Sequence, residues 1–281
     1  MADRAAVILA AGISSRMNTM MPKVLHEVCG RPMLAYVIDA CRQVGVAKIY
    51  VVVGFSAEQV RERFGGSADI EWVIQEKQLG TAHAVLCCKE HLKDFRGETL
   101  VLCGDGPLIR SLTLTTLIEK HEAEQAAATL ATAVLDDPTG YGRIVRDAYG
   151  NMQGIVEHSD CTKELLAIKE VNPSYYLFNN QVLFEALERV KPDNVKQEYY
   201  LTDVLSGIIR TGHKVVAVTA VRSEEAMGVN SRTAHRPCGG DDVVAHQYVF
   251  AFHLADYLSR LHLAAADSLL VYYRQIPAEV P

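Results

Sequence analysis

The chain has 281 residues, of which 49% are hydrophobic and 22% are charged, and this composition excludes a disordered or fibrous protein. Its 28 basic and 34 acidic side chains give a net charge of −6, which argues against general electrostatic binding to nucleic acid or to an anionic membrane. The seven cysteines are odd in number and form no C-x-x-C pair, so we expect reduced packing residues rather than disulfides or zinc ligands.

The chain carries no pattern typical of export or membrane insertion. Residues 1–4 lead directly into a short apolar run, unlike the start of a signal peptide. No stretch reaches the ~18–20 apolar residues that a membrane helix requires. We therefore expect a cytoplasmic protein.

Short apolar runs alternate with amphipathic segments along the first half of the chain. Strands are predicted over residues 5–10, 48–54, 70–75, 99–103 and 127–135. Helices are predicted over residues 32–45, 57–64, 82–92 and 113–124. Strands separated by helices of this length form βαβ units with parallel strands. The pattern predicts an α/β, Rossmann-like fold with a mostly parallel sheet and helices on both faces.

From Asp136 onward the pattern changes to an α+β extension, which we expect to lie on the first sheet. Its predicted elements are strands over 143–147, 152–158, 175–178 and 214–219, and helices over 182–190 and 201–211. No flexible linker interrupts this half, so we predict one compact domain over residues 1–232. The tail over 233–281 has no lysine and four of the ten histidines. It is either a genuine amphipathic helix or a frameshifted end.

The first motif follows the first predicted strand. Leu9-Ala10-Ala11-Gly12-Ile13-Ser14-Ser15-Arg16-Met17 is followed closely by Pro22-Lys23. Small residues allow a ligand to approach the backbone, and the N–H groups of such a turn, with Arg16 and Lys23, form an anion site. The spacings of a P-loop and of G-x-G-x-x-G are absent. By itself the motif leaves open a phosphate site and an ordinary packing turn.

The second motif lies at the end of a predicted strand and the start of a helix. Gln75 carries an amide that can both give and take a hydrogen bond, which matches the imide edge of uracil. Gly80-Thr81 has the composition of a helix cap whose backbone could contact a base or ribose. The alternative is an ordinary helix N-cap without a ligand.

The third motif is Gly104-Asp105-Gly106-Pro107, which follows the fourth predicted strand. Ligands of open α/β sheets collect at the carboxyl ends of the strands. One carboxylate beside a triphosphate suits Mg²⁺, which takes few ligands from protein and the rest from phosphate and water. The alternative is that Asp105 caps the turn that follows it.

Seven tracts together carry a family resemblance. In chain order they are LAAGxxxRM with PKVLH, QxxQLGTAHA, GDxPLI, DDPTGYGRIVR, GIVEHSD, QEYYLTD and GVNSR. The ordered set resembles the N-terminal uridylyltransferase domain of the bifunctional N-acetylglucosamine-1-phosphate uridylyltransferase/glucosamine-1-phosphate acetyltransferase family. The resemblance spans roughly residues 5–232. It implies a fold of the nucleotide-diphospho-sugar transferase type.

The resemblance also implies a role for individual residues. Arg16, Lys23 and Asp105 would be catalytic, the first two on the phosphates and the third on Mg²⁺ together with Asn230. The remaining nucleotide contacts would be Leu9, Ala11, Gly12, Gln75, Gly80 and Thr81. The sugar contacts would be Gly142, Glu157, Asn172, Tyr200 and Thr202.

The implied reaction is the Mg²⁺-dependent transfer of UMP from UTP to N-acetyl-α-D-glucosamine 1-phosphate. Its products are UDP-N-acetylglucosamine, a precursor of peptidoglycan and lipopolysaccharide, and pyrophosphate. The alternatives are another nucleotidyltransferase, such as a cytidylyltransferase, and a non-catalytic fragment that binds a nucleotide sugar. We expect no acetyltransferase activity and a monomer or weak oligomer, because the family's trimerising β-helix has no counterpart here.

The sequence departs from the family pattern at two short sites and in the tail. Ser14 stands where the family commonly has a second glycine, and Pro173-Ser174 stands where it usually has Thr-Gly. Serine lacks the conformational freedom of glycine, and Pro173 removes a backbone N–H. Beyond Arg232 nothing aligns with the family.

Overall fold

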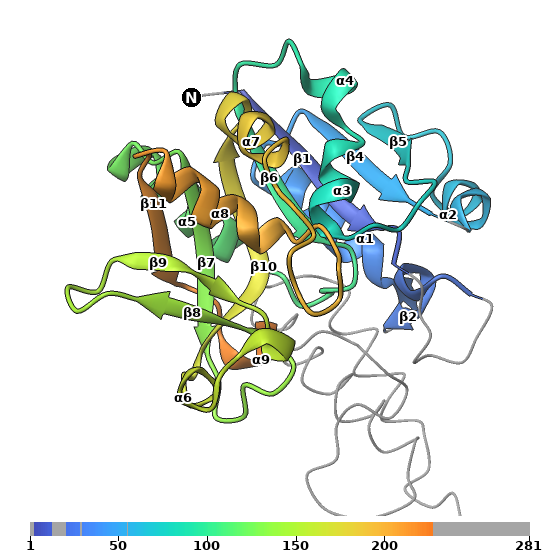
Figure 1. Cartoon of the computed structure of the whole chain (residues 1–281). Coiled ribbons are helices and arrows are strands. Elements are labelled where there is room, and N and C mark those ends of the chain that lie inside the picture. The colour runs from blue at the N-terminus through green and yellow to red at the C-terminus, as the bar shows by residue number, and fades with distance from the viewer. Residues whose placement is uncertain (1–2, 13–20, 29, 55, 227–281) are drawn as a thin grey trace, which may run out of the picture.

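The computed structural model describes residues 3–12, 21–28, 30–54 and 56–226. Within these residues, a nine-stranded sheet has the order β11-β7-β10-β6-β1-β4-β5, and the β8–β9 hairpin branches from β10 (Figure 1). The strands are β1 (Arg4–Ala10), β4 (Lys48–Val53), β5 (Ile70–Ile74), β6 (Glu98–Cys103), β7 (Ala128–Val134), β8 (Gly142–Arg146), β9 (Met152–Val156), β10 (Glu170–Asn179) and β11 (Val215–Thr219). A separate short hairpin joins β2 (Glu27–Val28) to β3 (Arg31–Pro32).

The helices cover both faces of the sheet, as the sequence predicts. They are α1 (Met33–Gln43), α2 (Ala57–Phe64), α3 (Thr81–Leu86), α4 (Lys89–Leu92), α5 (Ser111–Glu124), α6 (Lys163–Leu166), α7 (Asn180–Leu187), α8 (Leu201–Arg210) and α9 (Ser223–Ala226). The helix predicted over 82–92 is divided into α3 and α4 at Cys87 and Cys88. The structure also contains two 3₁₀ turns, η2 (Lys23–Leu25) and η3 (His158–Asp160).

Strand β1 lies at the centre of the fold and is buried on both faces. Successive side chains of a strand point to opposite faces, and those of Ala6 and Ile8 pack in the core that contains α1 and α5. Those of Ala5 and Val7 pack in the second core, with α3, α7 and α8. A continuous apolar run is therefore what this position requires. Figure 1 shows α7 and α8 in front of the sheet.

The sheet is mostly parallel but has an antiparallel strand near its centre. Strands β4, β1 and β6 pair in parallel, whereas β10 runs antiparallel between β6 and β7. We expected the extension to lie on the first sheet, but the structure differs. Strands β10 and β11 of the extension are themselves strands of that sheet. Tyr176 and Phe178 on β10 are almost fully buried, so this strand contributes core packing as well as hydrogen bonds.

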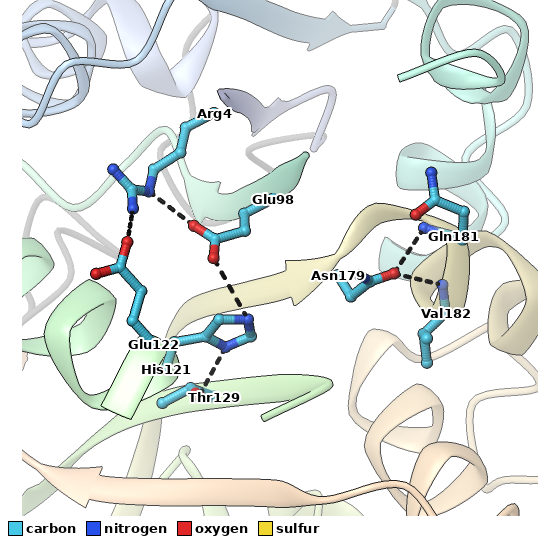
Figure 2. Close-up of polar contacts among 8 residues, drawn as sticks. All are labelled: Arg4, Glu98, His121, Glu122, Thr129, Asn179, Gln181 and Val182. Carbon is cyan, nitrogen blue, oxygen red and sulfur yellow. Dashed lines mark hydrogen bonds and ion pairs between the residues drawn. The ribbon is translucent and has the colours of Figure 1, made fainter. Parts of the chain in front are cut away.

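A local signal in the sequence explains the start of α7. Asn179 precedes α7, and its side-chain oxygen accepts hydrogen bonds from the backbone N–H groups of Gln181 and Val182, at 3.1 and 3.2 Å (Figure 2). Asparagine is among the preferred residues for this capping role.

The described cysteines carry free thiols, and burial raises the pKa of Cys41 to about 12. These thiols behave as packing residues, in agreement with the prediction.

No helix among the described residues is both long and apolar enough to cross a membrane. The tail over 233–281, with its predicted helix, lies outside the described residues. The boundary at residue 232 therefore stays a prediction.

Candidate active site

The predicted nucleotide residues leave the sheet at one edge. In the parallel registers, Leu9 lies beside Cys103, Ala10 beside Val53, and Val53 beside Ile74. The residues that follow β1, β5 and β6 therefore emerge at the carboxyl ends of neighbouring strands. The backbone N–H of Gly104 donates to Leu9 O at 2.9 Å, which holds the turn of Asp105 against the end of β1.

Asp105 forms an ion pair with Lys23 at this edge. Lys23 begins the η2 turn, and its Nζ contacts Oδ2 of Asp105. The side chains are 16% and 28% exposed, so the pair is partly open to solvent. The two predicted roles for Asp105, magnesium ligand or turn cap, are not decided by this contact and stay predictions. Lys23 also provides a positive charge where the first motif predicts an anion.

Gln75 follows β5 and is fixed by its surroundings. It is 3% exposed, and its backbone N–H donates to Val53 O at 2.8 Å. Its side-chain Nε2 lies 3.1 Å from Gly80 O and 2.9 Å from His83 Nδ1. Because Gly80 O can only accept, Nε2 is the atom that donates to it. The second motif thus forms a closed local network between β5 and α3.

Gly80 and Thr81 connect the start of α3 to the start of α8. Gly80 has φ +119°, and a Cβ there would lie 2.5 Å from Tyr199 O, so a larger residue is excluded by the backbone nearby. The hydroxyl of Thr81 accepts a hydrogen bond from Leu201 N at 2.9 Å. Gly80 occupies the N-cap position of α3 and offers no side-chain cap, so the cap prediction holds for its position only.

The predicted sugar residues meet on the β8–β9 hairpin, β10 and α8. Gly142 pairs with Asn172 across β8 and β10, and a Cβ at Gly142 would lie 2.8 Å from the side chain of Ile155. Thr202 donates a hydrogen bond to Glu157 Oε1 at 3.1 Å. Burial raises the pKa of the Glu157 carboxyl. These contacts place a backbone segment without a side chain close to a partly buried carboxylate.

Asn172 and Tyr200 complete this half. Asn172 is 6% exposed, and its Nδ2 donates to the hydroxyl of Tyr176 at 2.6 Å. Its Oδ1 accepts from the backbone N–H of Ser174 at 3.0 Å. Ser174 has φ +68°, a left-handed conformation at the position where the sequence departs from the family's glycine. Tyr200 lies directly before α8 and is buried.

A cavity of about 60 Å³ lies between the predicted nucleotide residues and the predicted sugar residues. Its lining joins predicted nucleotide residues to predicted sugar residues: Leu9, Thr81, Val101, Leu102, Cys103, Glu157, Asn172, Ser174, Tyr176, Leu201 and Thr202. Cys103 and Tyr176 were not singled out from the sequence, because both read there as strand core. A shallow hollow beside α2, lined by Ala57, Glu58, Arg61, Glu62 and Ile74, contains none of the predicted residues.

Two predicted ligands, Arg16 and Asn230, lie outside the described residues, as does Ser14. Over the part of the chain that is described, no cluster of three or more His, Cys, Asp or Glu side chains has the arrangement of a metal site. A magnesium ion held by one carboxylate and completed by phosphate and water needs no such cluster. Asp105 offers one carboxylate at the strand ends, and this fits that limited demand.

Residues 6–200 match the family described as the MobA-like NTP transferase domain. The chain belongs to this family. It is also 49% identical over 234 residues to the bifunctional protein GlmU of Geobacillus sp. (strain WCH70), and this alignment covers 83% of the chain and 50% of the relative. The same protein of Listeria monocytogenes serotype 4b (strain F2365) is 48% identical over 235 residues, with 83% and 51% covered. The chain spans about half the length of these relatives, and the resemblance predicted from its tracts is confirmed.

Solved structures confirm the fold class. UDP-glucose pyrophosphorylase complexed with UDP-glucose has a TM-score of 0.66, covers 77% of this chain and is covered over 90% of its own length. The apo form of the same protein has a TM-score of 0.67. At 16% sequence identity this likeness concerns the mixed, mostly parallel α/β architecture alone. This chain therefore shares its α/β architecture with UDP-glucose pyrophosphorylase.

Proposed function

We propose that this NTP transferase moves UMP from UTP to N-acetyl-α-D-glucosamine 1-phosphate and releases pyrophosphate. The product, UDP-N-acetylglucosamine, would serve peptidoglycan and lipopolysaccharide precursor synthesis. The observation that carries this proposal is the cavity between the carboxyl ends of the strands and the β8–β9 region, which joins Leu9 and Thr81 to Glu157, Asn172 and Thr202. Two substrates must meet in this reaction, and the cavity lies between two groups of residues suited to them.

The nucleotide is proposed to bind along the ends of β1, β5 and β6. Leu9, Ala11 and Gly12 provide backbone that a ligand can approach closely, and Gln75 with Gly80 and Thr81 provides hydrogen-bonding groups for uracil. Lys23 and Arg16 supply positive charge for the triphosphate. The partly exposed ion pair of Lys23 with Asp105 supports this placement, because a phosphate oxygen can replace one carboxylate contact of the lysine at little cost.

The sugar phosphate is proposed to bind against β8, β10 and α8. Gly142 leaves space beside Glu157, and the Glu157 carboxylate already accepts a hydrogen bond from Thr202. Asn172 carries an amide of fixed orientation, since both its oxygen and its nitrogen are bonded. Hydroxyl and amide groups of an N-acetylated sugar need such fixed acceptors and donors. Tyr200 directly precedes Leu201, which lines the cavity, and it is proposed to lie near the sugar or its phosphate.

In the proposed reaction an oxygen of the sugar 1-phosphate attacks the α-phosphorus of UTP in line. A new P–O bond forms to this oxygen, and the bond from the α-phosphorus to the pyrophosphate oxygen breaks. The attacking phosphate is already ionised at neutral pH, so no protein nucleophile or general base is required. Two anions must approach each other, and the role of the chain is to align them and to neutralise their charge with Lys23 and Arg16.

Asp105 and Asn230 are the residues that we propose to hold Mg²⁺. When bound, such an ion screens the phosphate charges and orients the leaving group. The carboxylate of Asp105 uses only Oδ2 in its contact with Lys23. A hard cation with oxygen ligands suits a carboxylate and an amide carbonyl.

We further propose that residues 1–232 form the catalytic domain, with the tail over 233–281 outside it. We also propose that the chain acts in the cytoplasm and as a monomer or weak oligomer.

The test is a release assay for pyrophosphate with purified protein, Mg²⁺ and N-acetylglucosamine 1-phosphate. UTP, CTP, GTP and dTTP are compared at equal concentration, and glucose 1-phosphate replaces the N-acetylated sugar in a parallel series. The proposal expects turnover with UTP that depends on the N-acetylated sugar phosphate. Preference for CTP would instead favour a cytidylyltransferase. Thermal stabilisation by UDP-N-acetylglucosamine without any turnover would favour a binding protein.

A further inference from the structure

We infer that His83 is a positioning residue that sets base specificity by holding the Gln75 amide in one orientation. His83 lies on α3, within the QLGTAHA tract, and its Nδ1 is 2.9 Å from Nε2 of Gln75. The inference rests on the proposed function, in which Gln75 faces the base of the nucleotide. It adds a residue that does not itself contact the base.

The orientation of the Gln75 amide follows from its two neighbours. Gly80 O has no hydrogen to give, so the side-chain atom 3.1 Å away must be the nitrogen rather than the oxygen. The amide nitrogen has two hydrogens, and the second points to His83 Nδ1. Nδ1 must then be an acceptor, and the ring proton of the neutral imidazole resides on Nε2. Both donors of Gln75 are therefore used within the protein.

The two hydrogen bonds of Nε2 leave the oxygen of the Gln75 amide, Oε1, without a partner in this network. Over the described residues, no donor bonds to its Oε1, and this atom is not completely buried. Gln75 as a whole is 3% exposed, and in the proposed complex Oε1 is the atom of its side chain that is left to accept a hydrogen bond from the base. An amide that in solution can both give and take a hydrogen bond is here restricted to taking one.

An amide restricted to accepting discriminates between pyrimidines. Uracil carries a hydrogen on N3 and can donate it to Oε1, whereas N3 of cytosine carries a lone pair that Oε1 repels. If the amide turned over, Nε2 would face the base and would suit cytosine. Turning over would also place Oε1 against Gly80 O and His83 Nδ1, two acceptors. The network thus favours uracil and thymine over cytosine.

The experiment compares His83→Phe, His83→Asn and His83→Gln with the unsubstituted chain. Phe keeps the ring and removes the acceptor. The Oδ1 of Asn can take the place of Nδ1, whereas the longer side chain of Gln extends toward the position of Nε2. Steady-state kcat and KM are measured for UTP and for CTP. We expect the UTP/CTP ratio of kcat/KM to fall about tenfold in the Phe and Gln variants, mainly through a higher KM for UTP, and to be retained in the Asn variant.

His91→Phe is the matched control, because it makes the same change on the neighbouring helix α4. His91 contacts Glu71 through Nδ1 at 2.6 Å and has no contact with Gln75. We expect it to leave the ratio unchanged. If His83→Phe does not fold, His83→Gln makes the same comparison. An unchanged ratio in the folded variant, or an equal fall in the His91 control, would overturn the inference.

Failure of the proposed function is separately visible. If the unsubstituted chain turns over no nucleotide, the proposed reaction is wrong, and the role of His83 is then judged by calorimetric binding of UTP and CTP. A UTP preference that falls in His83→Phe supports the inference. Equal binding of the two nucleotides by the unsubstituted chain, or a preference that survives His83→Phe, overturns it.

Discussion

The two edges of the central sheet use similar charged groups in different ways. At the amino edge, Arg4 begins β1 and bonds Glu98 at 2.8 Å, and it also contacts Glu122 (Figure 2). Arg4 is 7% exposed and Glu98 13%. His121 is buried beside them and bonds Thr129 at 2.9 Å. The polar groups of this edge are satisfied within the protein.

At the carboxyl edge the same kinds of groups are left partly available. The Lys23–Asp105 pair is more exposed than the Arg4–Glu98 pair, and among the described residues the hydrogen bonds of the Gln75 side chain use Nε2 and leave Oε1 without a donor. Polar networks whose groups are all hydrogen-bonded within the protein rigidify a fold. Networks with unused donors or acceptors stabilise it less but can bind a ligand. We therefore expect removal of a charged group at the amino edge to change stability and removal of a charged group at the carboxyl edge to change activity.

The sharpest test of this difference is Asp105→Ala. We expect the turnover rate to fall about 10³-fold, because the proposed ligand of Mg²⁺ and the partner of Lys23 is lost. The melting temperature should stay within about 2 °C of the original, since a partly exposed ion pair contributes little. Asp136→Ala is the control: it removes a carboxylate from an exposed pair with Lys169, at 3.3 Å, and should change neither quantity. Near-normal turnover of the Asp105 variant with Mg²⁺ would make the metal assignment wrong.

The opposite result is expected at the amino edge. Arg4→Met leaves Glu98 without its main partner in a nearly buried position, which should lower the free energy of unfolding by about 3 kcal/mol. The rate of turnover per folded molecule at 25 °C should stay within about twofold of the original value. Urea denaturation and the pyrophosphate assay measure the two effects on the same preparation. A loss of turnover comparable to that of Asp105→Ala would remove the proposed difference between the edges.

The extent to which the sequence predicts this molecule varies with the kind of contact. Buried parallel strands were predictable, because residues such as Ala6 and Val7 on β1 must be apolar on both faces. The direction of β10 was not, since a short apolar run has the same appearance in either orientation. The relation between Thr81 and Leu201 was also beyond reach, because 120 residues separate the two.

The residues of the candidate site also divide into those that could be predicted from the sequence and those that could not. Lys23 and Asp105 could be proposed from motifs at strand ends, where chemistry and position in the chain coincide. His83 could not, because its role depends on the atom that it faces rather than on its own type. The QLGTAHA tract contained that signal, but only the distance to Gln75 reveals it. Arg16 and Asn230 lie outside the described residues, so their roles stay predictions.

The amino edge should also determine part of the pH dependence of stability. Burial lowers the pKa of His121 from 6.5 to about 4. Between these values the unfolded chain binds a proton that the folded chain does not, so the free energy of unfolding decreases as the pH falls through this window. His121 should account for a loss of about 2 kcal/mol between pH 7 and pH 4.5. His121→Gln should be less stable at pH 7 but should lack this part of the decline. Parallel curves for the two proteins in urea titrations would contradict the assignment.

The smallest expected effect concerns backbone strain at the carboxyl edge. Ser174 lines the cavity with φ +68°, a conformation that costs a residue with a side chain about 1 kcal/mol. Ser174→Gly relieves this strain, and the greater freedom of glycine in the unfolded chain offsets part of the gain. We expect a net stabilisation of about 0.5 kcal/mol. The backbone N–H that donates to Asn172 is retained, so the KM for the sugar phosphate should stay the same. Ala at this position keeps the strain and is the matched control in the same urea titration. A gain for Ala as large as that for Gly would show that the side chain of Ser174, rather than its φ angle, limits stability at this edge.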